Sequence, residues 1–251
     1  MKTHIVIPAR RESVRLPNKP LLDIVGTPMI VRVLQRGEAA DLGDVCVATD
    51  DAEIVDCVRA AGGTAEVTRD DHPSGTDRIA EVARRRGWPA DDIVVNLQGD
   101  EPLMPPALLR QVAALLDATP RAGIATLATP IATREDFLNP NVVKVVSGAD
   151  GLALYFSRAP IPHGRADAAA ALAAARRHLG LYAYRVAVLE RLVEASPTPL
   201  EQLEKLEQLR AFALGIPIAV TDAEVAPGPG VDTQADLDDV RRRIAAGDIW
   251  G

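Results

Sequence analysis

Apolar and polar positions alternate along the first half of the chain in blocks that are typical of βα units. Short apolar runs predict buried strands at residues 5–7, 44–48 and 92–98, and the last run is nearly continuous, as in a strand covered on both faces. Helical periodicity predicts helices at residues 29–40, 52–61, 78–86 and 106–118. Repeated βα units indicate an α/β protein with a mainly parallel sheet.

The pattern changes after residue 122, where turns separate shorter apolar runs. We predict strands at residues 123–128, 142–146 and 152–156, in an antiparallel extension of the sheet. Residues 165–177 are rich in alanine and offer almost no apolar anchor, so we expect a mobile loop there rather than an Ala-rich helix. Residues 201–214 predict one helix ended by Gly215, and residues 235–246 predict the last helix.

The composition of the 251-residue chain is that of an ordinary globular protein, with 47% hydrophobic and 25% charged residues. Its net charge of −7 argues against nucleic acid or an anionic membrane as the main partner. Cys46 and Cys57 form no C-x-x-C pair, so neither a disulfide framework nor a zinc site is predicted. No apolar stretch approaches the roughly 20 residues of a membrane span, and we expect a cytoplasmic protein without a signal peptide or membrane insertion.

A cluster of cations directly after the first predicted strand is the most informative feature of the sequence. Pro17 and Pro20 disfavour a helix in this segment, so we place the cations on a loop. Ligands of open α/β sheets bind at the carboxyl ends of strands, and Arg and Lys side chains there suit a polyanion. Neither a G-x-G-x-x-G nor a P-loop motif is present, and the alternative is a surface loop with unrelated basic residues. The cations are Arg10, Arg11, Arg15 and Lys19.

Two acidic turns are candidates for a metal site. Asp100 follows the third predicted strand, where a carboxylate near a phosphate-binding loop is well placed for Mg²⁺, or where it merely caps the turn. Asp232 follows a Pro-Gly-Pro-Gly segment that restricts the backbone, so it can supply a second carboxylate. Its alternative role is the N-cap of the last helix, which Thr233 or Asp236 could fill equally well.

Two segments carry polar side chains that suit a ligand. Ser74 precedes the predicted helix that contains Arg78, and a helix N-terminus favours an anionic group, although plain capping explains the residue too. His178, Tyr182 and Tyr184 share one face of a predicted strand and suit a polyhydroxylated ligand. The alternative for His178 is a half-buried histidine with its hydrogen bonds satisfied.

A third segment offers Glu204, Glu207 and Gln208 on one helix face, for which a solvated surface is the default interpretation. No Ser-His-Asp or Cys-His pattern emerges along the chain, so covalent catalysis is not expected.

Taken in order along the chain, these motifs resemble the 3-deoxy-manno-octulosonate cytidylyltransferases (CMP-Kdo synthetases) of lipopolysaccharide assembly. The resemblance covers nearly the whole chain and is weakest in residues 165–177, which we expect to be a variable loop near the sugar side. It is carried by IPARRESVRLPNKPL, VATDD, SGTDRIAE, VVNLQGDEP, NPNVVKVV, ALYFSRAPIP, RHLGLYAYR, LEKLEQLR and PGPGVDTQADL.

The resemblance implies a role for each matching residue. Asp100 and Asp232 would hold Mg²⁺, and Lys19, Arg10 and Asp100 would act in catalysis. The residues implied to bind the nucleotide, CTP, are Arg10, Ser13, Arg15, Lys19, Ser74, Arg78 and Gln98. The residues implied to bind the sugar, Kdo, are Gln98, Arg158, His178, Tyr182, Glu207 and Gln208.

The resemblance also implies a three-layer α/β/α fold of the nucleotide-diphospho-sugar transferase type, in one domain over residues 1–251. Residues 1–120 and 215–251 would form the nucleotide-binding core, and residues 121–214 a smaller antiparallel lobe for sugar binding and homodimer formation. The anomeric hydroxyl of Kdo would attack the α-phosphorus of CTP and release pyrophosphate. Because both substrates are anions, catalysis would consist mainly of positioning and charge neutralisation.

Three alternatives remain beside this function. The first is a cytidylyltransferase for a related acidic sugar, either 8-amino-Kdo or a sialic acid, which only residues 155–210 would distinguish. The second is a non-catalytic regulator that binds a nucleotide or sugar on the same fold, which loss of Asp100, Asp232 or Lys19 would favour; all three are present. The third, a nicotinamide oxidoreductase, is disfavoured by the missing glycine fingerprint.

Overall fold

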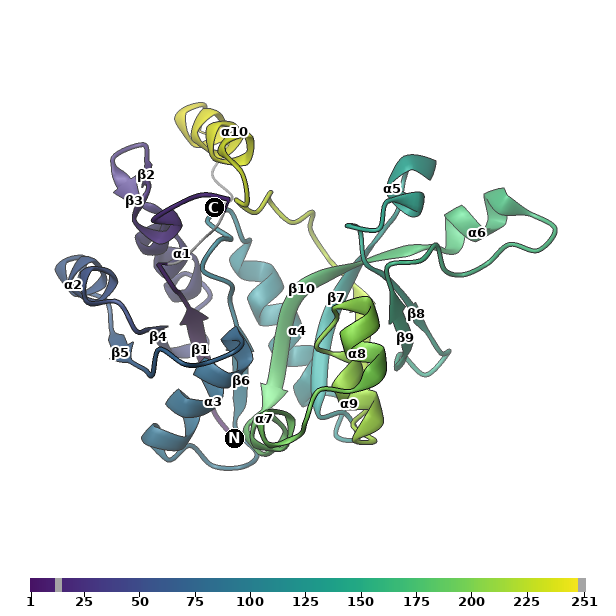
Figure 1. Cartoon of the computed structure of the whole chain (residues 1–251), viewed down its shortest axis with the longest axis horizontal. Coiled ribbons are helices and arrows are strands. Elements are labelled where there is room, and N and C mark those ends of the chain that lie inside the picture. The colour runs from purple at the N-terminus through teal and green to yellow at the C-terminus, as the bar shows by residue number, and fades with distance from the viewer. Residues whose placement is uncertain (12–14, 248–251) are drawn as a thin grey trace.

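The computed structural model describes residues 1–11 and 15–247 (Figure 1). Within these residues, a nine-stranded sheet has the order β11-β7-β10-β6-β1-β4-β5, and β8 and β9 extend from β10. Its strands are β1 (Thr3–Pro8), β4 (Gly43–Thr49), β5 (Ala65–Val67), β6 (Ile93–Asn96), β7 (Ile124–Pro130), β8 (Lys144–Ser147), β9 (Ala153–Ser157), β10 (Arg176–Arg185) and β11 (Ile218–Asp222). Two short strands, β2 (Asp23–Ile24) and β3 (Thr27–Pro28), pair separately.

Helices cover both faces of the sheet, which confirms the three-layer α/β/α fold. One face carries α1 (Met29–Glu38), α2 (Ala52–Ala60), α4 (Pro106–Asp117) and α10 (Gln234–Ala245). The other carries α3 (Gly75–Arg86), α7 (Val186–Glu194) and α9 (Leu209–Ala213), with α8 (Pro199–Glu204) packed against α9. The sheet has a hydrophobic core on each face. Because side chains alternate along a strand, successive residues pack into opposite cores: Ile5 and Ile7 lie in the first and Val6 in the second.

Both parallel and antiparallel pairing occur in the sheet. β8 and β9 form the antiparallel extension that the sequence predicts, whereas β7, predicted to be part of it, lies inside the main sheet between β10 and β11. β1 pairs in parallel with β4 and β6, β4 with β5, and β7 with β11. β10 runs antiparallel between β6 and β7, so the segment 121–214 contributes two strands to the centre of the sheet. Four other elements of that segment, α5 (Arg134–Leu138), β8, β9 and α6 (Ala168–Ala174), gather at one end of the molecule, whereas its helices α7, α8 and α9 lie over the sheet (Figure 1).

Two sequence-based predictions of secondary structure are wrong. The first is the loop over residues 165–177, which contains α6. The Asp167 carboxylate caps this helix by accepting the backbone N–H groups of Ala169 and Ala170, both at 2.9 Å. Ala171 and Ala175 then pack into a small cluster with Ile131, Phe137 and Val142. Alanine has the highest helix propensity, so a capped Ala-rich segment with even a small apolar contact becomes helical.

The second wrong prediction is the single helix over residues 201–214. The structure has α8 and α9 instead, because Lys205 takes a left-handed conformation with φ of +54° and ends α8. Glu204, on α8, accepts hydrogen bonds from the Ser157 hydroxyl at 2.6 Å and the Arg158 N–H at 2.9 Å. Glu204, Glu207 and Gln208 therefore do not share one helix face.

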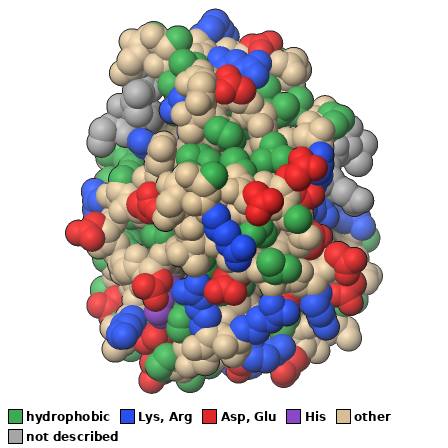
Figure 2. All heavy atoms as spheres, turned by 90° about the vertical axis from the view of Figure 1, so that its left-hand side faces the viewer, with side chains coloured by type: hydrophobic (Ala, Val, Ile, Leu, Met, Phe, Trp, Pro, Cys, Tyr) green, Lys and Arg blue, Asp and Glu red, His purple; other side chains and the backbone are tan. Residues whose placement is uncertain are grey.

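Over the described part of the chain, no helix has both the length and the apolar character needed to cross a membrane. On the face drawn in Figure 2, acidic and basic side chains lie interspersed rather than in one broad patch of a single sign.

Candidate active site

A cavity of about 560 Å³ lies at the edge of the sheet where the parallel strands β1, β4 and β6 end. Its walls are the loop after β1, the N-terminus of α3 and the turn after β6. Most of the predicted nucleotide and metal residues line it, namely Arg10, Arg15, Lys19, Ser74, Arg78, Gln98, Asp100 and Asp232. Ser13, also predicted to bind the nucleotide, lies outside the described residues. Residues far apart in the sequence thus meet in one cavity.

Two glycines allow these walls to approach closely. A Cβ on Gly99, in the turn after β6, would lie 2.9 Å from the carbonyl oxygen of Pro8 at the end of β1. A Cβ on Gly75, the first residue of α3, would lie 3.2 Å from Cγ of Pro8. Both α3 and the turn that carries Asp100 can therefore pack directly against the end of β1.

Lys19 joins the two predicted metal-binding carboxylates. It begins the short 3₁₀ helix η1 (Lys19–Leu21), and its Nζ lies 2.7 Å from Oδ2 of Asp100 and 3.1 Å from Oδ1 of Asp232. The same Nζ donates to the carbonyl oxygen of Val231 at 2.6 Å, and Arg15 lies 3.2 Å from Asp232 Oδ1. The two carboxylates therefore converge on one cation.

This convergence suits a divalent metal ion. Carboxylate oxygens are hard ligands, and Mg²⁺ is usually bound through one or two carboxylates together with substrate phosphates and water. Among the described residues, no group of three or more His, Cys, Asp and Glu side chains is arranged to hold a metal. The two aspartates provide carboxylate oxygens of the kind that such an ion takes.

The alternative role of Asp232 as a helix N-cap is excluded. Thr233 caps α10, since its hydroxyl accepts the Asp236 N–H at 3.3 Å and the Asp236 side chain accepts the Thr233 N–H at 2.8 Å. The Asp232 carboxylate therefore remains with Lys19 and Arg15.

Ser74 and Arg78 have structural partners as well as a place in the cavity wall. The Ser74 hydroxyl caps α3 by accepting the Asp77 N–H at 3.3 Å, which confirms the capping interpretation. Arg78 is buried, hydrogen-bonds to the Thr68 hydroxyl and lies 3.4 Å from Asp50 Oδ2. These contacts fix both side chains at the N-terminus of α3, whose backbone N–H groups favour an anionic ligand.

Glu101 is a titratable neighbour that the sequence analysis missed, although it directly follows Asp100. Removal from water, and then the negative charges of Asp100 and Asp232, raise the pKa of Glu101 to about 8. The charges of Arg177 and Lys19 act in the opposite direction. Arg177, an exposed residue on β10, is therefore a further cation near the acidic centre, beside Lys19 and Arg15, and it was not predicted.

Of the predicted sugar-side residues, His178, Tyr182 and Glu207 lie close together on and beside β10, next to Tyr184. The ring centroids of His178 and Tyr182 are 5.2 Å apart, and those of Tyr182 and Tyr184 are 5.6 Å apart. Burial lowers the pKa of His178 to about 3, so its imidazole is neutral, with Nε2 3.0 Å from the Thr126 hydroxyl. Burial also raises the pKa of Tyr182, and the charge of nearby Glu207 adds to that shift.

Arg158 is held by backbone carbonyl groups. Its guanidinium donates to the carbonyl oxygens of Glu204 at 2.6 Å, Pro140 at 2.9 Å and Lys205 at 3.4 Å. The wall of the cavity at the sheet edge, as far as the structure describes it, does not include the sugar-side residues Arg158, His178, Tyr182, Glu207 and Gln208.

Comparisons with known proteins agree with this arrangement. The family model described as "Cytidylyltransferase" matches residues 4–218. The chain is 52% identical over 240 residues to the 3-deoxy-manno-octulosonate cytidylyltransferase of Yersinia pseudotuberculosis serotype O:1b (strain IP 31758), covering 94% of this chain and 96% of that protein. It is 53% identical over 247 residues to the protein of the same name from Hahella chejuensis (strain KCTC 2396), covering 96% and 97%.

Solved structures give the same result. A CMP:2-keto-3-deoxy-manno-octonic acid synthetase complexed with CTP superimposes with a TM-score of 0.89 at 46% identity, covering 98% of this chain and all of that one. A cytidylyltransferase from Leptospira borgpetersenii serovar Hardjo-bovis (strain JB197) has a TM-score of 0.63 at 19% identity over 98% of this chain and 87% of its own, a likeness of fold alone. The chain therefore belongs to the cytidylyltransferase family, among the 3-deoxy-manno-octulosonate cytidylyltransferases.

Proposed function

We propose that the protein transfers CMP from CTP to the anomeric hydroxyl of Kdo, giving CMP-Kdo and pyrophosphate for lipopolysaccharide biosynthesis. The observation that carries this proposal is the cavity at the sheet edge, where Lys19 and Arg15 meet Asp100 and Asp232. Such a combination of cations and carboxylates suits a triphosphate bound with a divalent metal ion. The identity of more than half to relatives named for this reaction supports the same substrates.

Arg10, Arg15 and Lys19 would hold the triphosphate, and Ser74, Arg78 and Gln98 would line the cytidine side. Arg10 is exposed and has no ion pair with any described residue, so its guanidinium is free for bidentate contacts to phosphate oxygens. Lys19 and Arg10 would stabilise the negative charge that develops on the departing pyrophosphate.

Asp100 and Asp232 would hold the divalent ion, which we propose to be Mg²⁺. When bound, Mg²⁺ would supply charge neutralisation and Lewis-acid polarisation of a phosphoryl oxygen. The two aspartates orient one carboxylate oxygen each toward the same point, as their shared contact with Lys19 indicates.

The sugar would bind beside β10, with Gln98 reaching it from the nucleotide side. The neutral imidazole of His178, the Tyr182 hydroxyl and Glu207 offer donors and acceptors for sugar hydroxyl groups. Gln208 would add an amide. Arg158 uses three of its N–H groups on backbone carbonyls and retains others for the carboxylate of the sugar.

We also propose a homodimer that uses the segment 121–214, with residues 1–120 and 215–251 as the nucleotide-binding core. Leu154 on β9 is 65% exposed and Leu138 on α5 is 46% exposed, at the end of the molecule where β8, β9, α5 and α6 gather. Apolar side chains exposed in one patch mark an interface between protein chains, and these two leucines are the candidates for such a patch. We further propose a cytoplasmic location, in keeping with a nucleotide substrate. Light scattering after size exclusion tests the dimer.

A cytidylyltransferase for 8-amino-Kdo or a sialic acid is the second candidate, since the nucleotide side would be the same. The test is pyrophosphate release from CTP and Mg²⁺ with Kdo, 8-amino-Kdo and N-acetylneuraminate in parallel. Release with Kdo alone is expected. Release only with another sugar would keep the nucleotide and metal assignments and overturn the sugar-side ones. CTP binding without release with any sugar would favour a regulatory role.

A further inference from the structure

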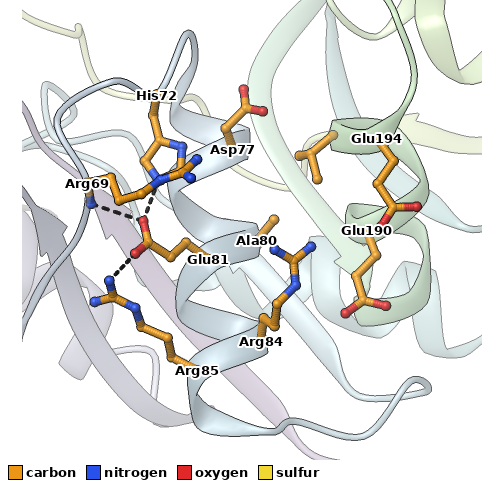
Figure 3. A pocket seen from close by; sticks show the side chains of 10 residues that line it. Arg69, His72, Asp77, Ala80, Glu81, Arg84, Arg85, Glu190 and Glu194 are labelled. Atoms are coloured by element: carbon orange, nitrogen blue, oxygen red, sulfur yellow. Dashed lines mark hydrogen bonds and ion pairs between the residues drawn. The ribbon is translucent and has the colours of Figure 1, made fainter.

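A second cavity, of about 600 Å³, lies between α3 and α7 and shares one side chain with the nucleotide cavity (Figure 3). That side chain is His72, which lines both cavities and is only 5% exposed. His72 stands two residues before Ser74, the N-cap of α3. The imidazole is thus part of the wall that separates the two cavities.

Glu81, on α3, lines only the second cavity and binds three donors there. Its Oε2 accepts the backbone N–H of Arg69 at 3.0 Å and bonds with Nε2 of His72, while its Oε1 pairs with Arg85 (Figure 3). Desolvation raises the pKa of Glu81, but the bonds from His72 and Arg69 and the charge of Arg85 outweigh it, and the pKa lies below its ordinary value. Glu81 is therefore an ionised acceptor with both oxygens in use.

Helix α3 holds the segment before it through several side chains, among them Arg85, which donates to the Val67 carbonyl oxygen. Arg78 bonds with the Thr68 hydroxyl, and Glu81, one turn further along the helix, bonds with Arg69 and His72. The held segment leads directly to Ser74 and the nucleotide cavity. Without the Glu81 contacts, His72 would be free to leave the cavity wall, while the bond between Arg78 and Thr68 remained.

We propose that Glu81 is a positioning residue of the nucleotide site, which acts through His72 to fix the cavity wall that faces the nucleoside part of CTP. This inference rests on the proposed binding of CTP. With Nε2 committed to Glu81, the second ring nitrogen of His72 and the ring itself remain to contact the ligand. Glu81 does not reach the nucleotide cavity itself, so its effect must pass through the neighbouring segment.

The first test is Glu81→Gln, assayed for the KM of CTP and of Kdo and for kcat. A glutamine side chain has one acceptor oxygen for three converging donors, so at least one donor loses its partner. We expect the KM of CTP to rise about tenfold, the size of effect typical of one lost charge-assisted hydrogen bond, with kcat and the KM of Kdo changed less than about twofold. Glu81→Asp, which keeps the charge, should give a smaller rise.

Two control variants separate positioning from loss of charge. Arg85→Gln removes the partner of Oε1 and a bond to the Val67 carbonyl oxygen but leaves His72 and Arg69 bonded, and Glu190→Gln removes a charge from the far wall of the same cavity. Both should leave the KM of CTP within about twofold of wild type. A rise as large as that of Glu81→Gln in either control would overturn the proposal.

A double-mutant cycle tests whether the effect passes through His72. In a His72→Gln background, Glu81→Gln should change the CTP dissociation constant, measured by calorimetry, by less than about twofold. An undiminished effect in that background, or an unchanged dissociation constant in Glu81→Gln alone, would overturn the inference. Wild-type protein that binds CTP but transfers nothing to Kdo would overturn the proposed reaction alone, and wild-type protein that binds no CTP would overturn both.

Discussion

The half-buried carboxyl group of Glu101 predicts that the free energy of unfolding depends on pH. Its pKa is about 8 in the folded protein against an ordinary value of 4.5, because of burial and then because of Asp100 and Asp232. Between these two values the unfolded chain releases a proton that the folded protein keeps, so stability falls as the pH rises through this window. At 1.36 kcal/mol per unit the shift corresponds to roughly 5 kcal/mol, and because water reaches part of the side chain we expect about 2–5 kcal/mol.

The perturbation is Glu101→Gln, and the assay is urea unfolding of metal-free protein at pH 5, 6.5 and 8. The variant should gain about 2–3.5 kcal/mol of unfolding free energy relative to wild type between pH 5 and pH 8, since an amide does not ionise. Glu38→Gln, at an exposed position on α1, is the matched control and should show a difference that does not vary with pH. Saturating Mg²⁺ should reduce the pH dependence of the wild type, because it would offset the charges of Asp100 and Asp232.

A difference between Glu101→Gln and wild type that stays constant within about 0.5 kcal/mol from pH 5 to pH 8 would refute this reasoning. It would mean that water or a cation reaches the carboxylate well enough to keep its pKa near the ordinary value.

Three further predictions concern single substitutions. Asp100→Ala should lower kcat about 10²–10³-fold in the pyrophosphate-release assay, as for the loss of one strong electrostatic contact, and near-normal turnover would contradict its metal role. Lys144→Met should lower the unfolding free energy by about 2–4 kcal/mol in urea, because the fully buried ammonium donates to three backbone carbonyl groups, and an unchanged midpoint would contradict this. Gly99→Ala should lower the unfolding free energy by about 1–3 kcal/mol and raise the KM of CTP, since its Cβ would lie 2.9 Å from the Pro8 carbonyl oxygen. Wild-type kinetics in this variant would contradict the prediction, because they would show that the turn relaxes freely.

The first half of the fold could be predicted because each element has a local signal. Apolar runs mark β1, β4 and β6, and Asp51 and Ser74 mark the starts of α2 and α3 as N-caps. Parallel pairing then brings the strand ends to one edge, so the cations of the first loop and Asp100 could be expected to meet there. Asp232 could be assigned to this site only from the family resemblance and from the restricted backbone of the segment before it.

Other features depend on contacts that the sequence does not display. Lys205 ends α8 in a left-handed conformation, a position where glycine is the usual signal. The helical state of α6 depends on Ala171 and Ala175 finding Phe137 across the fold. Likewise, the acceptors that hold Arg158 are backbone carbonyl groups, which every residue carries and no motif marks.

The ion pair between Lys19 and Asp232 joins positions 213 residues apart, which has a consequence for protein synthesis. A ribosome adds roughly 5–20 residues per second, so about 10–40 s pass between the synthesis of the cationic loop and that of the second carboxylate. During that interval the segment with Arg10, Arg15 and Lys19 has already left the ribosome, while Asp232 has not yet been synthesised. The growing chain can therefore form its first βα units and attract anions well before it can assemble the pair of aspartates.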